Sequence, residues 1–178
     1  MAETAFPGKP GKESLLTGPA GRLLLKLAAF ALLLGVFFTF IMGIHIQHGN
    51  RMYPFIMDGD VVVIWKPGKC REGDVVAYRN PDTGETALSR VIAMGENRIE
   101  VTGSGVLTVN GLVPAEQVFY PTAPLSESRI TWPYEMGPRG IFVLDDLRTE
   151  GKDSRLFGEL HESDLLGRVV YIFRRRGI

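Results

Sequence analysis

The sequence has almost no cysteine, which limits the kinds of domain that it can form. Only one of its 178 residues is a cysteine, Cys70, so an internal disulfide framework and a cysteine-rich metal site are both excluded. Cys70 lies in a turn-like stretch, 67–71, where we expect a solvent-exposed thiol without a catalytic role. We expect neither a metal ion nor a cofactor.

An excess of charge of one sign is also absent. Lys and Arg together number 20, as do Asp and Glu, and the formal net charge at pH 7 is zero. The sequence has no basic tract with interleaved aromatic residues, which is a pattern typical of nucleic-acid surfaces. We therefore expect no nucleic-acid partner. Hydrophobic residues make up 45% of the chain, which is enough for one packed domain.

One long stretch near the start has no charge at all. Residues 27–44 are apolar, and as a helix they would span about 27 Å, close to the thickness of a bilayer's hydrocarbon core. Basic residues precede the stretch and favour a cytoplasmic N-terminus: Lys9, Lys12, Arg22 and Lys26. We expect a disordered cytoplasmic tail over 1–22, a transmembrane anchor over 23–46 and an extracytoplasmic domain over 47–178.

A cleaved secretory signal is the alternative interpretation of the apolar stretch. It would need a shorter apolar core followed by a small-x-small cleavage site. The stretch instead continues directly into residues 44–48, IHIQH, which contain no such site. We therefore expect a single, uncleaved membrane span.

The remainder of the chain lacks a convincing amphipathic helix and consists of short β-like runs between turn signals. We expect strands at 61–65, 74–78, 86–94, 98–101, 106–109, 140–144 and 169–173. Asn110-Gly111 is a hairpin signal because both residues tolerate positive φ. A proline-rich, irregular insertion is expected around 120–138. These patterns predict a mainly β domain.

Four stretches of this domain form a recognisable series. They are GNRMYP (49–54), DGDVVV with EGDVV (58–63 and 72–76), SRVIA (89–93), and DDLR with DSRLFG (145–148 and 153–158). In this order, behind an apolar anchor, they resemble the sequence boxes of the type I signal peptidases, peptidase family S26. The resemblance covers most of 47–178. It implies coiled antiparallel β-sheets with one N-terminal transmembrane helix and a membrane-proximal groove for an extended peptide.

The chemistry that the resemblance implies requires a serine nucleophile and a neutral lysine as its general base. At the corresponding positions this sequence has Arg51 and Ser89. A guanidinium has no nucleophilic oxygen, and a serine hydroxyl is not a base at neutral pH. A further serine position, which in the family helps to orient the lysine, holds Gly151, and Asp145 replaces a glycine. We therefore expect no intact catalytic site.

The positions that serve as scaffold in the family are retained. The resemblance assigns a structural charge cluster to Arg90, Asp153 and Arg155. It assigns the peptide groove to Gly49, Arg51, Met52, Pro54 and Ser89. The catalytic residues are thus replaced while the scaffold residues are retained, and this combination predicts a pseudoenzyme.

Arg51 has two interpretations from the sequence. In the first interpretation it is a surface arginine that arose by neutral substitution and faces water or a nearby carboxylate such as Asp58. In the second its charge lies at the floor of the groove, where it pairs with an acidic ligand or plugs the cleft. None of the three histidines stands at the Ser89 position, so a non-standard active site is the less favoured alternative.

The sequence therefore predicts a non-catalytic signal peptidase homologue in the cell membrane. Its expected partners are the membrane, through a single span, and extended segments of secreted or pilin polypeptides. The chain also resembles the signal-peptidase-like proteins of pilus assembly on Gram-positive surfaces. The leading hypothesis that this resemblance implies is an accessory protein or chaperone in pilus or surface-protein assembly. The alternatives are an active serine endopeptidase that removes signal peptides with a non-standard site, and a membrane-tethered interaction domain.

Overall fold

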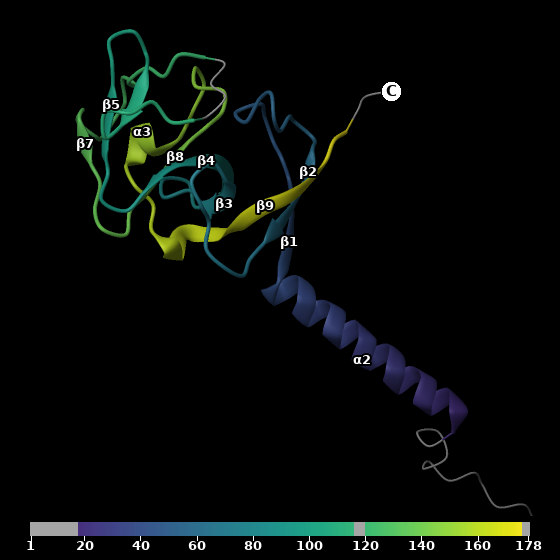
Figure 1. Cartoon of the computed structure of the whole chain (residues 1–178). Coiled ribbons are helices and arrows are strands. Elements are labelled where there is room, and N and C mark those ends of the chain that lie inside the picture. Colours follow the sequence, from purple (N-terminus) through teal and green to yellow (C-terminus); the bar gives the residue numbers. More distant parts are fainter. Residues whose placement is uncertain (1–17, 116–119, 176–178) are drawn as a thin grey trace, which may run out of the picture. The chain divides into compact units, whose positions relative to one another are not determined.

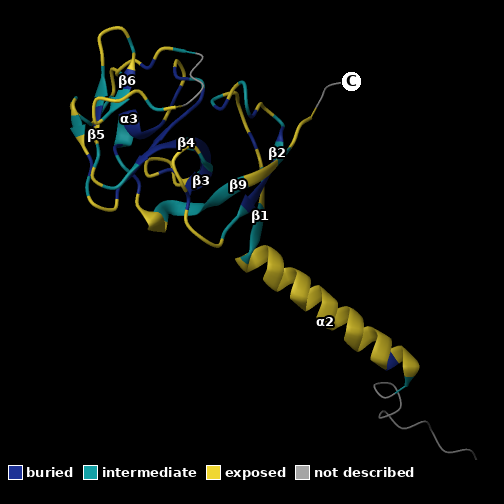
Figure 2. Cartoon of the chain, viewed as in Figure 1, coloured by how far each residue is buried: buried dark blue, intermediate teal, exposed yellow. Residues whose placement is uncertain are grey.

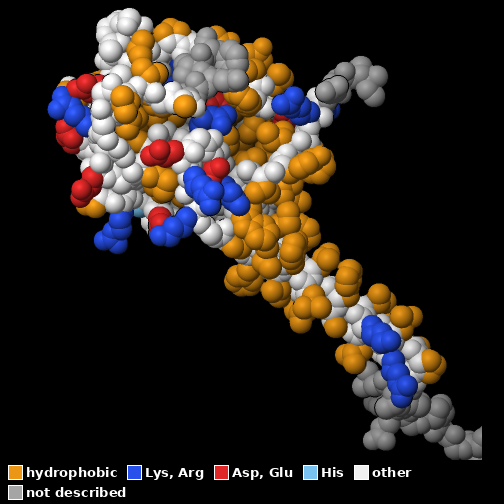
Figure 3. Space-filling view, in the orientation of Figure 1, with side chains coloured by type: hydrophobic (Ala, Val, Ile, Leu, Met, Phe, Trp, Pro, Cys, Tyr) orange, Lys and Arg blue, Asp and Glu red, His pale blue; other side chains and the backbone are white. Residues whose placement is uncertain are grey.

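The computed structural model describes residues 18–115 and 120–175 (Figure 1). They belong to two units that divide after Phe40. The first unit contains helix α2 (Pro19–Phe40), whose 22 residues rise about 33 Å. The helix is long and apolar enough to cross a membrane. Figure 3 shows hydrophobic side chains along most of its visible face.

The helix boundaries differ from those expected. It begins at Pro19, inside the expected tail, because proline is favoured in the first turn of a helix, where its missing N–H has no partner to lose. The rest of the expected tail, residues 1–17, lies outside the described residues. The helix ends at Phe40, before the expected anchor end at residue 46.

The second unit contains two antiparallel sheets. The larger has the strand order β1-β2-β9-β3-β4-β8, and the smaller has the order β6-β5-β7. The strands are β1 (Met42–Ile46), β2 (Val61–Trp65), β3 (Val75–Arg79), β4 (Thr86–Met94), β5 (Arg98–Val101), β6 (Leu107–Val109), β7 (Tyr134–Glu135), β8 (Ile141–Leu144) and β9 (Leu165–Phe173). Helix α3 (Ser154–Phe157) and a short 3-10 turn (Glu162–Asp164) complete the unit. The expected fold, mainly antiparallel β with one N-terminal apolar helix, is confirmed.

Strand β1 is the main correction to the expected domain boundaries. Residues 42–46 were expected inside the anchor, but they pair antiparallel with β2, from Met42 opposite Trp65 to Ile46 opposite Val61. The period-two alternation of Ile44, His45 and Ile46 is a strand pattern that the preceding apolar run conceals in the sequence. The β unit therefore begins at Ile41, six residues before the expected start at 47.

Two further expectations need correction. Strand β9 begins at Leu165 instead of 169, and the expected irregular insertion contains β7, which pairs with β5. The Cys70 thiol, expected to be exposed, is buried in a core cluster with Val76 and Tyr78. Burial raises the pKa of the thiol. A buried thiol of raised pKa is a poor nucleophile.

Two similar turns open strands β2 and β3. In each, glycine adopts a positive φ, 82° at Gly59 and 87° at Gly73, as the third residue of a type II turn requires. The aspartate that follows, Asp60 or Asp74, accepts a hydrogen bond on its carboxylate from the backbone N–H three residues earlier. The repeated Gly-Asp pattern therefore fixes where two strands of the sheet begin.

Apolar side chains from the strands form three core clusters within the β unit, and Figure 2 shows the buried residues on the inner strands. One cluster contains Met52 and Ile56 with Val62, Ala77 and Leu88. It anchors the turn segment between β1 and β2 to the sheet. That segment also carries Arg51, so the core holds the backbone of this residue in place.

Candidate functional site

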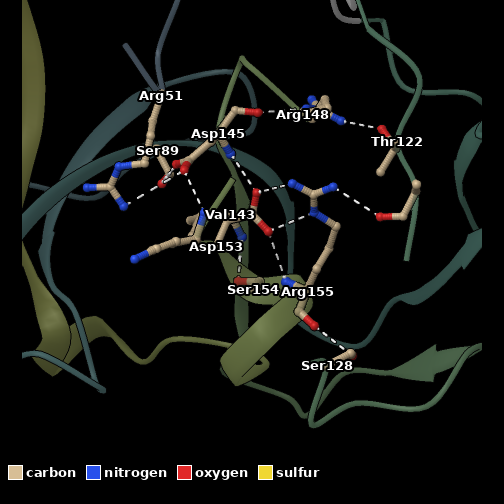
Figure 4. A network of polar contacts seen from close by, with 12 residues as sticks. Arg51, Ser89, Thr122, Ser128, Val143, Asp145, Arg148, Asp153, Ser154 and Arg155 are labelled. Atoms are coloured by element: carbon tan, nitrogen blue, oxygen red, sulfur yellow. Dashed lines mark hydrogen bonds and ion pairs between the residues drawn. The ribbon is translucent and has the colours of Figure 1, made fainter. Parts of the chain in front are cut away.

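Three polar residues from distant parts of the chain meet at one point beside the sheet (Figure 4). Arg51 lies in the segment between β1 and β2, Ser89 lies in β4, and Asp145 follows β8. Strands β4 and β8 are neighbours, with Arg90 opposite Leu144. The backbone N–H of Leu147 donates to the carbonyl of Arg51 at 2.8 Å. The sheet register and this one bond together bring the three side chains into contact.

The hydroxyl of Ser89 is fully buried and already engaged. Its Oγ donates to Oδ1 of Asp145 at 2.5 Å and lies 3.1 Å from the hydroxyl of Tyr78. Burial raises the pKa of Tyr78, so its phenol stays neutral. The serine therefore lies within the protein interior, between a phenol and a carboxyl group.

Asp145 is the electrostatic centre of this site. Burial, and after it the negative charge of nearby Asp153, together raise its pKa to about 7. The Ser89 hydroxyl, the Arg51 charge and the backbone N–H of Lys152 act in the opposite direction. That N–H donates to Oδ2 at 3.0 Å. Asp145 is consequently a carboxyl group that changes its charge near neutral pH.

Arg51 faces Asp145 from the more exposed side. Its Nη1 lies 4.0 Å from Oδ2 of Asp145, and its side chain is 28% exposed. Asp58, the carboxylate suggested by the sequence, accepts instead from the backbone N–H of Gly49 at 2.7 Å. Asp145 could not be recognised as the partner from sequence, because it is 94 residues away from Arg51 along the chain.

Arg51 also borders a cavity of about 550 Å³. The other residues that line it are His45, Gln47, His48, Glu85 and Thr86. Burial lowers the pKa of His45, and His48 lowers it further, so its imidazole is neutral at pH 7. The site thus combines a guanidinium, two imidazoles and open space. It contains no pairing of a serine hydroxyl with a basic side chain.

A comparison with known protein families identifies the family to which the chain belongs. Residues 21–174 match the family model described as signal peptidase, peptidase S26. The chain belongs to this signal peptidase family. It is the family that the sequence boxes indicated.

Several proteins of this family are similar to the chain. The signal peptidase I of Leptolyngbya laminosa is 30% identical over 118 residues, which cover 58% of this chain and 52% of that protein. The signal peptidase I of Bacillus caldolyticus is 26% identical over 146 residues, covering 74% and 79%. Signal peptidase IB of Staphylococcus aureus is 26% identical over 168 residues, covering 84% and 87%.

The chain thus spans about half the length of the Leptolyngbya laminosa relative and most of the other two. A solved structure, the signal peptidase I of Enterococcus faecalis V583, aligns with 58% of this chain and 98% of its own at 22% identity. Its TM-score is 0.49.

The charge cluster of this signal peptidase homologue has a different arrangement from the one expected. Asp153 and Arg155 form a fully buried pair joined by two hydrogen bonds, of 2.9 and 2.8 Å. Arg90 forms its own two-point pair with Asp146, at 2.8 and 2.7 Å. Asp146 was missing from the expected cluster. The two pairs are connected through Asp145, which precedes Asp146 in the chain. The backbone N–H of Asp145 donates to Oδ2 of Asp153 at 3.1 Å.

Gly151, at the position of the expected auxiliary serine, has no room for a side chain. A Cβ there would overlap Nη2 of Arg155 and Oδ2 of Asp153. The signal peptidase homologue therefore packs its buried ion pair against the backbone of Gly151. A serine at this position would have to displace that pair.

The remaining residues expected in the groove fall into two groups. Gly49 has a φ of 77°, which suits glycine, and it leads into the Arg51 turn. Met52 is fully buried in the core and therefore supports the turn instead of lining a groove. Pro54 follows a cis peptide bond in the same segment and is partly exposed.

Proposed function

We propose that this signal peptidase homologue is non-catalytic and binds extended segments of secreted or surface proteins outside the cytoplasm. The observation that carries the proposal is the state of Ser89. Its hydroxyl is completely buried and donates its proton to Asp145. Hydrolysis requires a nucleophile that a substrate carbonyl can reach and a base that accepts its proton.

The second group at the site supports the same conclusion. A guanidinium group has no nucleophilic oxygen and is not a base in proteins, so Arg51 can serve in neither role. Loss of a single essential member of a serine protease's catalytic unit lowers turnover by about a millionfold in the best-studied case. Both positions have changed here.

The β unit offers an edge at which an extended peptide could be held. Strand β1 is the end strand of the six-stranded sheet as described, with β2 as its neighbour. An extended peptide adds to such an edge through backbone hydrogen bonds, and pockets for alternate side chains select its sequence. The cavity lined by His45 and Arg51 supplies one such pocket.

The cellular setting of the proposal follows from helix α2 and the charges before it. Arg22 and Lys26 lie at the N-terminal end of the apolar helix, and basic residues are retained on the cytoplasmic side of a membrane. The β unit then lies outside the cytoplasm, where secreted polypeptides emerge. We propose an accessory or chaperone role in the assembly of pili or other surface proteins of a Gram-positive bacterium. Pilin segments are then the first ligands to test.

An active enzyme with a non-standard site is the second candidate function. It is favoured by the bond from Ser89 to Asp145, since burial raises the pKa of that carboxyl to about 7. A carboxylate of that pKa would accept a serine proton more readily than an ordinary aspartate. The complete burial of Ser89 opposes this function, because a peptide carbonyl cannot reach the hydroxyl without a rearrangement of the sheet.

Site-specific crosslinking tests the binding function. A photoreactive phenylalanine at His48, beside the cavity, is compared with one at the exposed residue Arg71, which does not line the cavity. The full-length protein in lipid nanodiscs is mixed with an extended, labelled segment of a pilin. We expect crosslinks from position 48 and not from position 71. No crosslink at either position, or equal yields at both, would leave a membrane-tethered domain without a peptide site.

A further inference from the structure

We infer that the cavity beside Arg51 is a subsite for a carboxylate, so that the bound polypeptide presents an acidic side chain or its C-terminal carboxylate there. The inference rests on the proposed peptide-binding function and specifies the chemistry of its ligand.

The Arg51 guanidinium has donors that the described part of the chain does not use. A guanidinium carries five N–H donors in a planar fork that fits a carboxylate. The 4.0 Å contact with Asp145 is too long for a hydrogen bond, and no hydrogen bond of this side chain with another described residue is found. The guanidiniums of Arg90 and Arg155, in contrast, each form two short bonds with one carboxylate.

Asp145 neutralises Arg51 only in part. The carboxyl is buried, and its raised pKa means that a large fraction is protonated near pH 7. When Asp145 is protonated, the group that lies 4.0 Å from the Arg51 guanidinium is a neutral carboxyl, which does not compensate the positive charge. A partly buried, uncompensated charge favours an anion from outside, because the lower dielectric strengthens their attraction.

The cavity provides space and additional donors for such an anion. Its volume is about 550 Å³, and both His45 and His48 line it together with Arg51. An imidazole ring carries an N–H donor, so both side chains can donate a hydrogen bond to such an anion. Glu85 is the acidic member of the lining and is exposed, so it lies where water screens it. A carboxylate therefore has its most favourable position at the Arg51 side of the cavity.

The edge of β1 relates the cavity to a bound strand. His45 lies between exposed Ile44 and Ile46 and therefore points to the opposite face of the strand. A peptide residue paired directly opposite His45 presents its side chain on that same face. The pairing thus directs one particular side chain of the peptide toward the cavity, and an acidic residue at that position would reach Arg51.

Matched peptides test this inference with the full-length protein in lipid nanodiscs. The probes are fluorescent, N-acetylated decapeptides of alanine, valine and threonine with one central Glu or Gln, each with an amidated C-terminus. A third probe carries Gln and a free C-terminal carboxylate. We expect the Glu peptide to bind about tenfold more tightly than the amidated Gln peptide, as one charge-assisted bond contributes. The third probe shows whether a chain terminus can replace the side chain.

The variants identify the residue responsible. Arg51→Gln should abolish the preference for Glu, whereas Arg71→Gln, an exposed arginine outside the cavity, should retain it. The double variant Arg51→Gln with Asp145→Asn removes both charges of the contact, so it covers the case in which the single variant fails to fold. Loss of the preference in the double variant supports the subsite.

Two different negative results are distinguishable. Equal binding of the Glu, Gln and free-terminus peptides, or a preference that survives in the double variant, overturns the carboxylate subsite and leaves the binding function in place. Absence of binding by every peptide overturns the binding function itself, and the subsite with it.

Discussion

At the scale of single residues, Asp145 connects the two positions at which the family boxes place the reactive groups. Asp145 lies between Arg51 and Ser89 and contacts both. Its carboxyl accepts a hydrogen bond from Ser89, the residue at the position where the family boxes place the general base. The sequence predicts that reactive groups are lost at positions 51 and 89. It does not predict the contacts of Asp145, because they join residues that are distant along the chain.

Restoring the two reactive groups alone should therefore fail. In the variant Arg51→Ser with Ser89→Lys, the new amine lies beside Asp145, whose negative charge raises the pKa of the lysine and keeps it protonated. We expect no cleavage of a signal-peptide substrate by this variant, followed by mass spectrometry. Adding Asp145→Gly should give slow but measurable cleavage. Equal activity of the double and triple variants would show that Asp145 does not block the base.

The protonation of Asp145 should also make stability depend on pH. Burial raises its pKa from 3.8 to about 7, so between these values the folded chain holds a proton that the unfolded chain releases. Stability then decreases as the pH rises through this window, by up to about 1.4 kcal/mol per pH unit, and levels off above it.

The variant Asp145→Asn separates the contribution of Asp145 to the pH dependence of stability from the contributions of the other carboxylates. We expect the variant and the parent to have similar Tm values near pH 4, and the variant to be the more stable of the two at pH 8. Circular dichroism melts of the full-length proteins in detergent measure both. Parallel pH profiles for the two proteins would contradict the raised pKa.

At the scale of secondary-structure elements, the short helix α3 depends on a buried ion pair. Asp153 is the N-cap of α3 and accepts from the backbone N–H of Arg155 at 3.1 Å. The same carboxylate binds the Arg155 guanidinium, and both side chains are fully buried. Removal of one partner leaves a buried charge without compensation.

Asp153→Ala should consequently destabilise the β unit by about 3–5 kcal/mol. Asp82→Ala is the matched control, because it breaks an exposed ion pair, with Arg129, whose contribution is about 1 kcal/mol or less. Chemical unfolding of the two variants and the parent gives the comparison. Similar losses for both variants would mean that burial of the Asp153 pair adds nothing.

How well the sequence predicts a strand depends on the residues that flank it. Strands bounded by turn residues, such as β2 and β3, were predicted to within a residue, since the Gly-Asp turns fix their starts. Strand β1 was missed because its alternation follows directly on the apolar run of helix α2. The sequence marks positions such as Arg51 and Ser89 but not their partners, because ion pairs such as Arg90–Asp146 are set by the register of β4 with β8.

At the scale of the whole molecule, the account requires one membrane span with the β unit outside the cytoplasm. Protease added to intact spheroplasts should then degrade the β unit and leave a fragment that contains helix α2. The basic residues Arg22 and Lys26 before the apolar core are the physical reason. Digestion that occurs only after lysis would reverse the orientation and remove secreted chains from the possible ligands.

We propose that this signal peptidase homologue has lost catalysis. Incubation of the purified full-length protein with a preprotein in detergent tests this proposal. A preparation from cells without the gene serves as the control for host peptidases. The account predicts no mature product above that control, because the Ser89 hydroxyl is buried against Asp145 and Arg51 cannot replace it. Robust cleavage by the unmodified chain that disappears in Ser89→Ala would contradict the account.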